Sequence, residues 1–424
     1  MNIQIKNGTL VDPRNGVDGK NDIYLAGGKV AAIGRAPDGF KAERSIDAAG
    51  MVVCPGLVDL AARLREPGFE YKATLESEML AAAAGGVTSL ACPPDTDPAL
   101  DEPGLVEMLK SRAQSLKLVH VYPVGALTAR LAGERLTEMA ELTDAGCVAF
   151  SQADAPLRDT QVLWRAMQYA STFGFSVWLR PQDEFLARDG VAHDGEVATR
   201  LGLPGIPSFA ETIAISTIVH LARATGTRLH LCRLSTAEGI DMVRQAKREG
   251  LSLTCDVSAH HVHLSDMDIG YFDSHCHVVP PFRSQRDRDA LRRGLADGTV
   301  EAICSDHTPV DEDAKQLPFG ESEAGATCLE LLLPLTLKWA NELKVPMARA
   351  IAAVTAQPAA ILKIDAGHLA PGAVADVCVF DPNAYVRITR EHLKSQGKNT
   401  PFLGYELPGR VRCTLVAGEI VYEA

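Results

Sequence analysis

Short apolar runs alternate with longer amphipathic segments between residue 51 and about residue 362. The apolar runs have the length of strands, and the longer segments repeat their apolar residues at helical spacing. The eight predicted strands are Met51–Val58, Ser89–Cys92, Val119–Val124, Cys147–Phe150, Ser176–Leu179, Arg228–Cys232, Ser252–Val257 and Ala302–Cys304. The predicted helices include Thr74–Ala84, Gly133–Leu142, Ser208–Ala224 and Thr236–Glu249. Alternating strands and helices are typical of a parallel sheet, so we expect an α/β fold, a (β/α)8 barrel of the TIM type.

The two ends of the chain have a different pattern, with short strand-like runs separated by turns. Ile3–Val11 and Lys29–Ile33 lie near the start, and the dipeptide Gly27–Gly28 is a hairpin signal. Ala375–Asp381 and Arg410–Tyr422 form the corresponding pattern near the end. We therefore expect a small β-sandwich built from both termini. The predicted division is residues 1–50 and 363–424 for the sandwich and residues 51–362 for the barrel.

Composition narrows the class of protein. The 424 residues are 46% hydrophobic and 23% charged, which is sufficient for a large globular core. The net charge of −12 argues against nucleic acid or an anionic membrane as a partner. No apolar run has the length of a membrane span, and the first residues lack the apolar core of a signal peptide. The ten cysteines are scattered singly, as in reduced cytosolic proteins, so we expect a cytoplasmic protein.

The most informative stretch is Pro55–Gly68, which reads Pro-Gly-Leu-Val-Asp-Leu-Ala-Ala-Arg-Leu-Arg-Glu-Pro-Gly. It resembles the dihydroorotase branch of the metal-dependent amidohydrolases, where the stretch is Pro-Gly-Phe/Leu-Val/Ile-Asp-x-His-x-His-Leu-Arg-Glu-Pro-Gly. In that family the two histidines hold zinc at the mouth of the barrel. Here their places are taken by Ala61 and Arg63. The resemblance implies the barrel and the sandwich, but it also shows that this ligand pair is missing.

The other ligand positions of the family can be found in the same way. The acidic pair of Ala-Phe-Ser/Thr-Asp-Asp-Gly corresponds to Gln152 and Ala153, and Asp154 comes one residue late and would face differently. The ligand histidine of His-x-Glu-Asp corresponds to Arg180, and that of Ala-His-Val-Ser-Thr corresponds to Arg233. Arginine has no lone pair to offer a metal. Only the last ligand, Asp306, remains, as a vestige, so we expect no metal and no other cofactor.

The substrate contacts implied by the resemblance are also degraded. Arg65, which in the family grips the substrate carboxylate, is present. The asparagine of Met-Pro-Asn-Thr is Asp95, the asparagine of Asn-Pro-Pro-Leu-Arg is Val279, and the last histidine of Asp-His-Ala-Pro-His is Val310. A carboxylate at position 95 would repel an anionic substrate. We therefore expect no catalytic residues.

The arginines at the ligand positions have two interpretations. Drift would leave them solvated and without a role. Alternatively, Arg63, Arg180 and Arg233 supply the positive charge that the family draws from two zinc ions, with Asp306 and Asp95 as ionised partners. We favour this structural role because unpaired buried guanidinium groups would be costly. A site for a small anion or a nucleotide in this arginine-lined pocket stays open as the less favoured alternative.

Several histidines remain after the predicted strand Ser252–Val257. They are His260, His261, His263, His275 and His277. A relocated metal site with Asp306 is one interpretation, although His275 and His277 could chelate only if their segment is a strand. Inherited structural and surface histidines are the favoured interpretation.

Three functions remain open. The chain looks like the non-catalytic dihydroorotase-like chains that associate with aspartate carbamoyltransferase in some bacteria, which implies a pseudoenzyme that forms hetero-oligomers and contacts its own copies. The second function is an active cyclic-amide hydrolase, of the dihydroorotase or hydantoinase type, with an atypical site. The third is a metal-free protein that senses a small anion. Fold alone does not choose among them, because function depends on the site.

Overall fold

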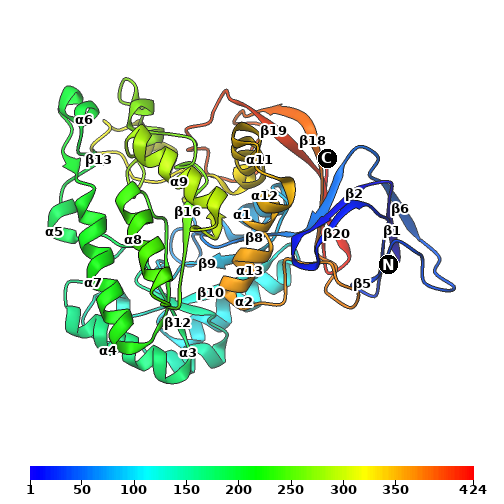
Figure 1. Ribbon diagram of the computed structural model, residues 1–424, viewed down its shortest axis with the longest axis horizontal. Helices are drawn as coiled ribbons and strands as arrows, with labels where there is room; N and C mark the ends of the chain where they lie inside the picture. The colour runs from blue at the N-terminus through cyan, green and yellow to red at the C-terminus, as the bar shows by residue number, and fades with distance from the viewer.

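A computed structural model describes residues 1–424, and its centre is a parallel eight-stranded barrel (Figure 1). In barrel order the strands are β8 (Leu57–Asp59), β9 (Val87–Cys92), β10 (His120–Ala126), β11 (Ala149–Ser151), β12 (Ser176–Leu179), β15 (Arg228–Leu231), β16 (Leu253–Ser258) and β17 (Ala302–Cys304). The predicted (β/α)8 fold is confirmed. A separate two-stranded sheet joins β13 (Ala192–His193) to β14 (Gly205–Ile206) in the region after β12.

Helices alternate with the barrel strands. The helices are α1 (Leu75–Ala84), α2 (Pro103–Leu116), α3 (Met139–Ala145), α4 (Thr160–Phe173), α5 (Glu184–Ala187), α6 (Glu196–Leu201), α7 (Phe209–Thr225), α8 (Ala237–Arg248), α9 (Gln285–Asp297), α10 (Glu312–Gln316), α11 (Leu332–Leu343), α12 (Met347–Ala352) and α13 (Ala356–Leu362). Helix α1 begins where the hydroxyl of Thr74 accepts a hydrogen bond from Ser77 N, which satisfies a free amide of the first turn. The helix predicted over Gly133–Leu142 is wrong in its start, because α3 begins only at Met139.

The first and last barrel strands meet through the segments that follow them. Ala62 bridges His307, and the bonds Arg63 N to His307 O (2.9 Å) and His307 N to Ala61 O (3.0 Å) continue the pairing beyond the ends of β8 and β17. These bonds lie at the carboxyl ends of the strands, where barrel enzymes carry their active sites. The region of closure is therefore also the region of the expected site.

Both termini build the second part of the molecule, at the right of Figure 1. One sheet has the order β5 (Lys29–Ile33), β4 (Ile23–Ala26), β1 (Ile3–Lys6) and β6 (Arg44–Asp47). The other has the order β20 (Glu419–Glu423), β19 (Glu406–Val416), β18 (Val377–Arg387), β7 (Val52–Pro55), β2 (Thr9–Asp12) and β3 (Val17–Lys20). A shared core of buried residues, such as Ile3, Leu25 and Val377, joins the two sheets. The sheets from both termini agree with the predicted sandwich.

One predicted strand is divided. We expected Met51–Val58 to be a single barrel strand, but Val52–Pro55 is β7 of the terminal sheet and only Leu57–Asp59 enters the barrel. Gly56 separates the two, and the close approach of Thr88, 2.1 Å from where a Cβ would lie, leaves room only for glycine. The terminal sheet therefore extends past residue 50, the boundary predicted from sequence.

The ten cysteines are all free thiols, and nine of them are buried. None of the helices has both the length and the apolar character that crossing a membrane requires.

Candidate functional site

The backbone turns sharply where the barrel strands end. Arg65, Ala153, Arg233 and Asp306 all have left-handed conformations, with φ values of 62°, 49°, 54° and 48°. Such conformations are uncommon for residues other than glycine, and they concentrate at active sites and binding sites. The strand ends thus keep a strained geometry of the kind that aims side chains into a barrel mouth.

Arg63 follows β8 and is 6% exposed. Its Nε donates to Asp95 Oδ2 at 2.7 Å, and its Nη2 donates to Asp154 Oδ2 at 2.6 Å. Its Nη1 donates to Thr308 Oγ1 at 2.8 Å and lies 3.4 Å from Asp306 Oδ1. All three nitrogens of this guanidinium group are therefore satisfied by acceptors at the barrel mouth.

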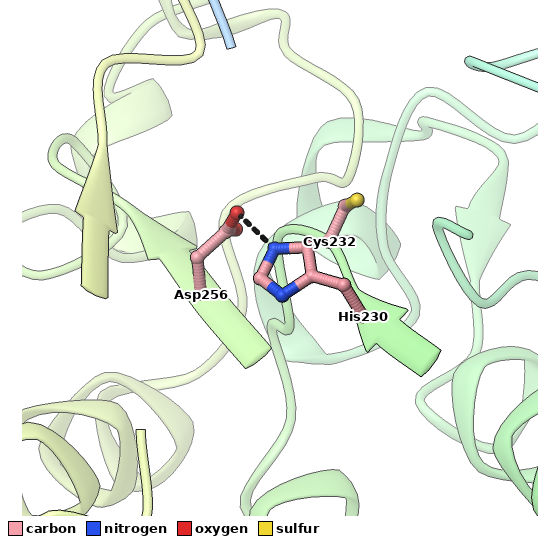
Figure 2. A group of neighbouring side chains, drawn as sticks. All are labelled: His230, Cys232 and Asp256. Atoms are coloured by element: carbon pink, nitrogen blue, oxygen red, sulfur yellow. Dashed lines mark hydrogen bonds and ion pairs between the residues drawn. The ribbon is translucent and has the colours of Figure 1, made fainter. Parts of the chain in front are cut away.

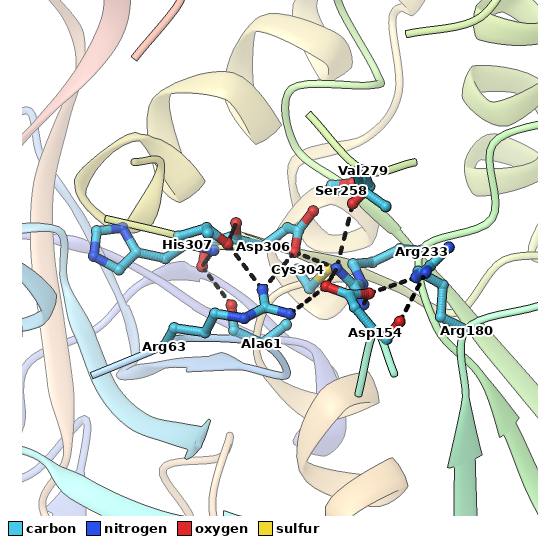
Figure 3. A network of polar contacts seen from close by, with 12 residues as sticks. Ala61, Arg63, Asp154, Arg180, Arg233, Ser258, Val279, Cys304, Asp306 and His307 are labelled. Carbon is cyan, nitrogen blue, oxygen red and sulfur yellow. Dashed lines mark hydrogen bonds and ion pairs between the residues drawn. The ribbon is translucent and has the colours of Figure 1, made fainter. Parts of the chain in front are cut away.

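Arg180, after β12, and Arg233, after β15, enter the same cluster from the other side (Figure 3). Arg233 donates through Nη2 to Asp154 Oδ1 at 2.6 Å and through Nη1 to Asp306 Oδ1 at 2.9 Å. Arg180 Nε also donates to Asp154 Oδ1. The carboxylate of Asp154 consequently accepts from all three arginines. These contacts join three arginines and three aspartates into one group, which we call the ion-pair cluster. They are Arg63, Arg180, Arg233, Asp95, Asp154 and Asp306.

Burial and pairing have different effects on the pKa values of Asp154 and Asp306. Burial opposes ionisation of Asp154, but Arg233, Arg180 and Arg63 outweigh it and hold the pKa of Asp154 well below its ordinary value. At Asp306 burial dominates, and the pKa of Asp306 is raised in spite of Arg233 and Arg63. Burial also works against the charge of Arg233, yet Asp154 and Asp306 raise the pKa of Arg233 well above its ordinary value. Asp154 is thus the stronger anchor of the cluster.

Sequence analysis missed the part played by Asp154, since it gave that residue no role. The left-handed Ala153 turns the chain, and the carboxylate of Asp154 then lies between the three guanidinium groups. A comparison of positions along a strand does not reveal such a turn. The sequence did contain one indication of this role: three arginines at one barrel mouth need an acidic partner to balance their charge.

The residues at the family's ligand positions do not fit a metal ion. Ala61 offers only a methyl side chain, and the side chain of Gln152 turns to Thr128 Oγ1 (2.9 Å) and Leu131 O (2.8 Å), away from the arginines. The guanidinium groups have no free electron pair, and their positive charge would repel a cation. The one carboxylate at a ligand position, Asp306, already accepts from Arg63 and Arg233.

The remaining histidines do not gather around Asp306. His261 contacts Ser258 Oγ (3.1 Å), and His263 donates to Leu335 O (2.8 Å). His275 lies in a short 3-10 helix, Ser274–Cys276, rather than in a strand, and pairs with Asp273. His277 contacts Ser322 Oγ at 3.0 Å.

His260 is the exception. Its Nε2 lies 3.7 Å from Asp306 Oδ2, and neither ring nitrogen has a hydrogen-bond partner. Burial and then Arg233 lower the pKa of His260 to about 3, so the ring is neutral at neutral pH. A single neutral imidazole beside an arginine-bound carboxylate does not make a relocated metal site.

One other group has the ligand types of a metal site, and the sequence analysis did not single it out. His230, Cys232 and Asp256 bring one ligand atom each within 4.8 Å of one another (Figure 2). Both ring nitrogens of His230 are engaged, Nε2 with Asp256 Oδ2 and Nδ1 with Thr254 Oγ1, each at 2.9 Å. Asp256 Oδ1 accepts from Arg233 N at 2.6 Å. Burial raises the pKa of Cys232 well above its ordinary value, so its thiol is protonated. The group ties β15 to β16 and fixes the backbone of Arg233.

The substrate positions of the family now make structural contacts. Arg65 Nε donates to Pro309 O at 2.8 Å, and Asp95 pairs with Arg63. Val279 O lies 3.4 Å from Arg233 Nη1, and Val310 N donates to Asn399 Oδ1 at 3.0 Å. Arg65 and Asp95 thus use their side chains within the chain, and Val279 and Val310 contribute backbone groups.

The frame around the cluster is held by buried polar residues. Asp59 accepts from Ser305 N at 2.7 Å and from Ser305 Oγ, and His307 Nε2 contacts Glu78 Oε2. His307 Nδ1 accepts from the backbone amides of Cys328 and Leu329. The segment that carries Asp306 is therefore fixed on both sides by contacts that need no metal.

An eight-stranded parallel barrel, closed at its carboxyl-terminal mouth and joined to a sandwich of both termini, is the architecture of the amidohydrolases. Profiles described as "Dihydro-orotase-like" and "Amidohydrolase family" match residues 50–239 and 336–422. A dihydroorotase-like protein of Pseudomonas putida is 43% identical over 422 residues, covering all of this chain and 99% of that protein. The chain belongs to the dihydroorotase family of the amidohydrolase superfamily.

Other relatives carry two different names. A protein of Pseudomonas aeruginosa, 44% identical over the full length of both chains, is named dihydroorotase-like protein. A protein of Geobacter sp. strain M21, 40% identical over the full length of both chains, is named dihydroorotase. The L-hydantoinase of Arthrobacter aurescens is a solved structure with the same fold, with a TM-score of 0.89, 24% identity and coverage of 99% of this chain and 96% of that one.

Proposed function

We propose that this chain is a non-catalytic, dihydroorotase-like subunit that supports the assembly or activity of aspartate carbamoyltransferase. The observation that carries the non-catalytic part is the ion-pair cluster. Three guanidinium groups and Asp154 fill the place where the resemblance to the family puts metal ligands. Hydrolysis of a cyclic amide needs an activated water and an electrophile for the carbonyl oxygen. Neither Arg63 nor Arg233 is free for that work, because carboxylates already occupy both.

The principal competing function is dihydroorotase activity, since the Geobacter relative has that name. Against it stands the neutralisation of Asp306, the one acidic ligand of the family pattern that this sequence keeps. Its Oδ1 accepts from Arg233 Nη1 at 2.9 Å and lies 3.4 Å from Arg63 Nη1, so two guanidinium groups compete with a proton for this oxygen.

The proposed scaffold role is supported by the resemblance to the non-catalytic chains that associate with aspartate carbamoyltransferase and by the intact fold. A barrel and a sandwich that each have a packed core, with arginines where the resemblance puts metal ligands, support a role in which the chain offers surface rather than chemistry. Oligomers are usually closed and symmetric, so we expect several copies of this chain to alternate with carbamoyltransferase trimers. A stable interface of this kind buries well over about 1,000 Å².

The test is co-expression of the full chain with the carbamoyltransferase chain of the same organism, compared with each chain alone. We expect one large complex by size exclusion with light scattering, and a smaller or less active carbamoyltransferase when this chain is absent. The isolated chain should not interconvert carbamoyl aspartate and dihydroorotate. Unchanged size and activity of the carbamoyltransferase without this chain would overturn the scaffold role, and metal-dependent ring hydrolysis would overturn the non-catalytic role.

A further inference from the structure

A second group of positive charge lies beside the barrel mouth, around a cavity of about 320 Å³. Four cationic and two acidic side chains line it. They are Lys72, Lys315, Arg390, Lys398, Asp311 and Glu312. We call this space the lysine cavity. The segment Thr308–Val310 separates it from the ion-pair cluster, because Thr308 accepts from Arg63 and Val310 lines the cavity.

Two of the four cations are already neutralised. Lys72 pairs with Glu323, and Arg390 Nη2 lies 2.8 Å from Glu312 Oε2. The other lining acid, Asp311, uses one carboxylate oxygen to accept from Asp313 N at the start of α10. These contacts leave two lysines to be accounted for.

Lys315 and Lys398 have no carboxylate partner. Lys315 Nζ donates to Ser274 O at 2.9 Å and to His277 O at 3.1 Å. Lys398 Nζ donates to Leu393 O at 2.7 Å and to Ser395 O. An ammonium group has three N–H donors, so each lysine keeps one donor that carbonyl oxygens do not use. Both side chains line the same cavity.

Burial makes this arrangement unfavourable without an anion. Lys315 is 6% exposed, and burial lowers its pKa to about 8 despite the more distant Glu323. A buried charge that has only neutral acceptors lacks the Coulombic compensation that a counter-ion supplies. The cavity wall therefore carries positive charge that a bound anion would balance.

The wall is also rigid. Asn399 holds it with three hydrogen bonds of 3.0 Å, donating to Thr308 O and Gly325 O and accepting from Val310 N. Ser395 Oγ and Gln396 N both bind the carboxylate of Glu78, at 2.7 and 3.0 Å. A pre-formed wall reduces the entropy lost when a ligand binds.

We infer that the lysine cavity binds the phosphate group of a small molecule, between the free N–H donors of Lys315 and Lys398. Lysine binds phosphate as a point charge, and the one arginine of the cavity, Arg390, is already paired with Glu312. The volume is at the low end of small-molecule pockets, which favours a compact ligand. The site is separate from the ion-pair cluster and does not depend on the scaffold role.

The test is isothermal titration of the full-length chain with inorganic phosphate and with glycerol phosphate, at constant ionic strength set by sodium chloride. We expect saturable binding. Tighter binding of glycerol phosphate would identify a phosphorylated metabolite as the ligand, and equal binding would identify free phosphate. Lys398→Gln, at a half-exposed position, should weaken binding at least tenfold.

Lys394→Gln is the matched control, because Lys394 is an exposed lysine of the same segment that does not line the cavity and loses the same charge. It should bind phosphate as the wild type does. The inference fails if phosphate produces no more heat or stabilisation than chloride at equal ionic strength. It also fails if the two lysine variants weaken binding equally, since the effect would then be that of overall charge.

Discussion

The ion-pair cluster and the lysine cavity are neighbouring groups of positive charge that differ in how the charge is paired. In the cluster, Asp154 alone accepts from three arginines, so the positive charge has internal partners. In the cavity, Lys315 and Lys398 donate only to carbonyl oxygens. A cation that is paired within the chain already has its counter-ion, whereas a cation without an acid partner can take one from a ligand. The comparison therefore separates a structural remnant from a candidate binding site.

The strongest way to break this comparison is Asp154→Asn. The change leaves three guanidinium groups without their common acid, and we expect the free energy of unfolding to fall by about 3 kcal/mol. This is the low end for a broken buried pair, because the Asp154 side chain is 34% exposed. Urea denaturation at pH 7 measures the change, with Asp144→Asn, an exposed acid on α3, as the control. A difference below about 0.5 kcal/mol would show that the cluster is solvated and without a structural role.

The same pair of proteins gives a pH test. The pKa of Asp154 is lowered on folding, so its stabilising contribution is present above the ordinary value of about 3.9 and is lost as pH falls through the folded value. The difference in stability between wild type and Asp154→Asn should stay constant from about pH 8 to pH 5 and shrink below about pH 4. A difference that instead grows toward low pH would contradict the assignment of Asp154 as the ionised anchor.

A smaller effect is expected for Asp306→Asn. Burial raises the pKa of Asp306, so its charge is already costly, and the asparagine oxygen can still accept from Arg233 Nη1. We expect a loss of about 1–2 kcal/mol, seen as a lower Tm. A loss larger than that of Asp154→Asn would mean that Asp306, not Asp154, anchors the arginines.

In the lysine cavity, by contrast, we expect a substitution to change phosphate binding and to leave the stability of the free protein almost unchanged. Lys398→Gln removes a charge that has no acid partner, so stability without ligand should change by no more than about 0.5 kcal/mol. Addition of phosphate should then raise the Tm of the wild type more than that of the variant. A large loss of stability without phosphate would assign Lys398 to the structure rather than to a ligand.

The smallest expected effect is the change in Tm when metal is removed or added. Because guanidinium groups occupy ligand positions, chelator treatment and added zinc should leave the Tm and the metal content of the purified chain unchanged. Elemental analysis and thermal unfolding measure this. The double variant Ala61→His with Arg63→His should also stay inactive, since Arg180 and Arg233 remain at two further ligand positions. One tightly held metal per chain would contradict this prediction.

Much of the fold could be predicted from the sequence because short apolar runs, typical of strands, alternate with longer amphipathic segments, typical of helices. The division of Met51–Val58 could not, since two buried strands joined through Gly56 form one continuous apolar run. The three arginines were found because each replaces a residue of a motif. Asp154 was missed because a left-handed turn at Ala153 redirects it, and Lys315 and Lys398 were missed because each is an unremarkable lysine until the fold brings them together.

Strand β7 lies between a strand from the start of the chain and a strand from its end, which bears on folding during translation. Its backbone bonds to β2 on one edge and to β18 on the other, while the barrel strands all lie between Leu57 and Cys304. Domains fold as units while the chain emerges from the ribosome. The barrel strands can therefore assemble first, with β7 keeping one edge open. That edge of β7 is closed only when residues 377–380 have been synthesised.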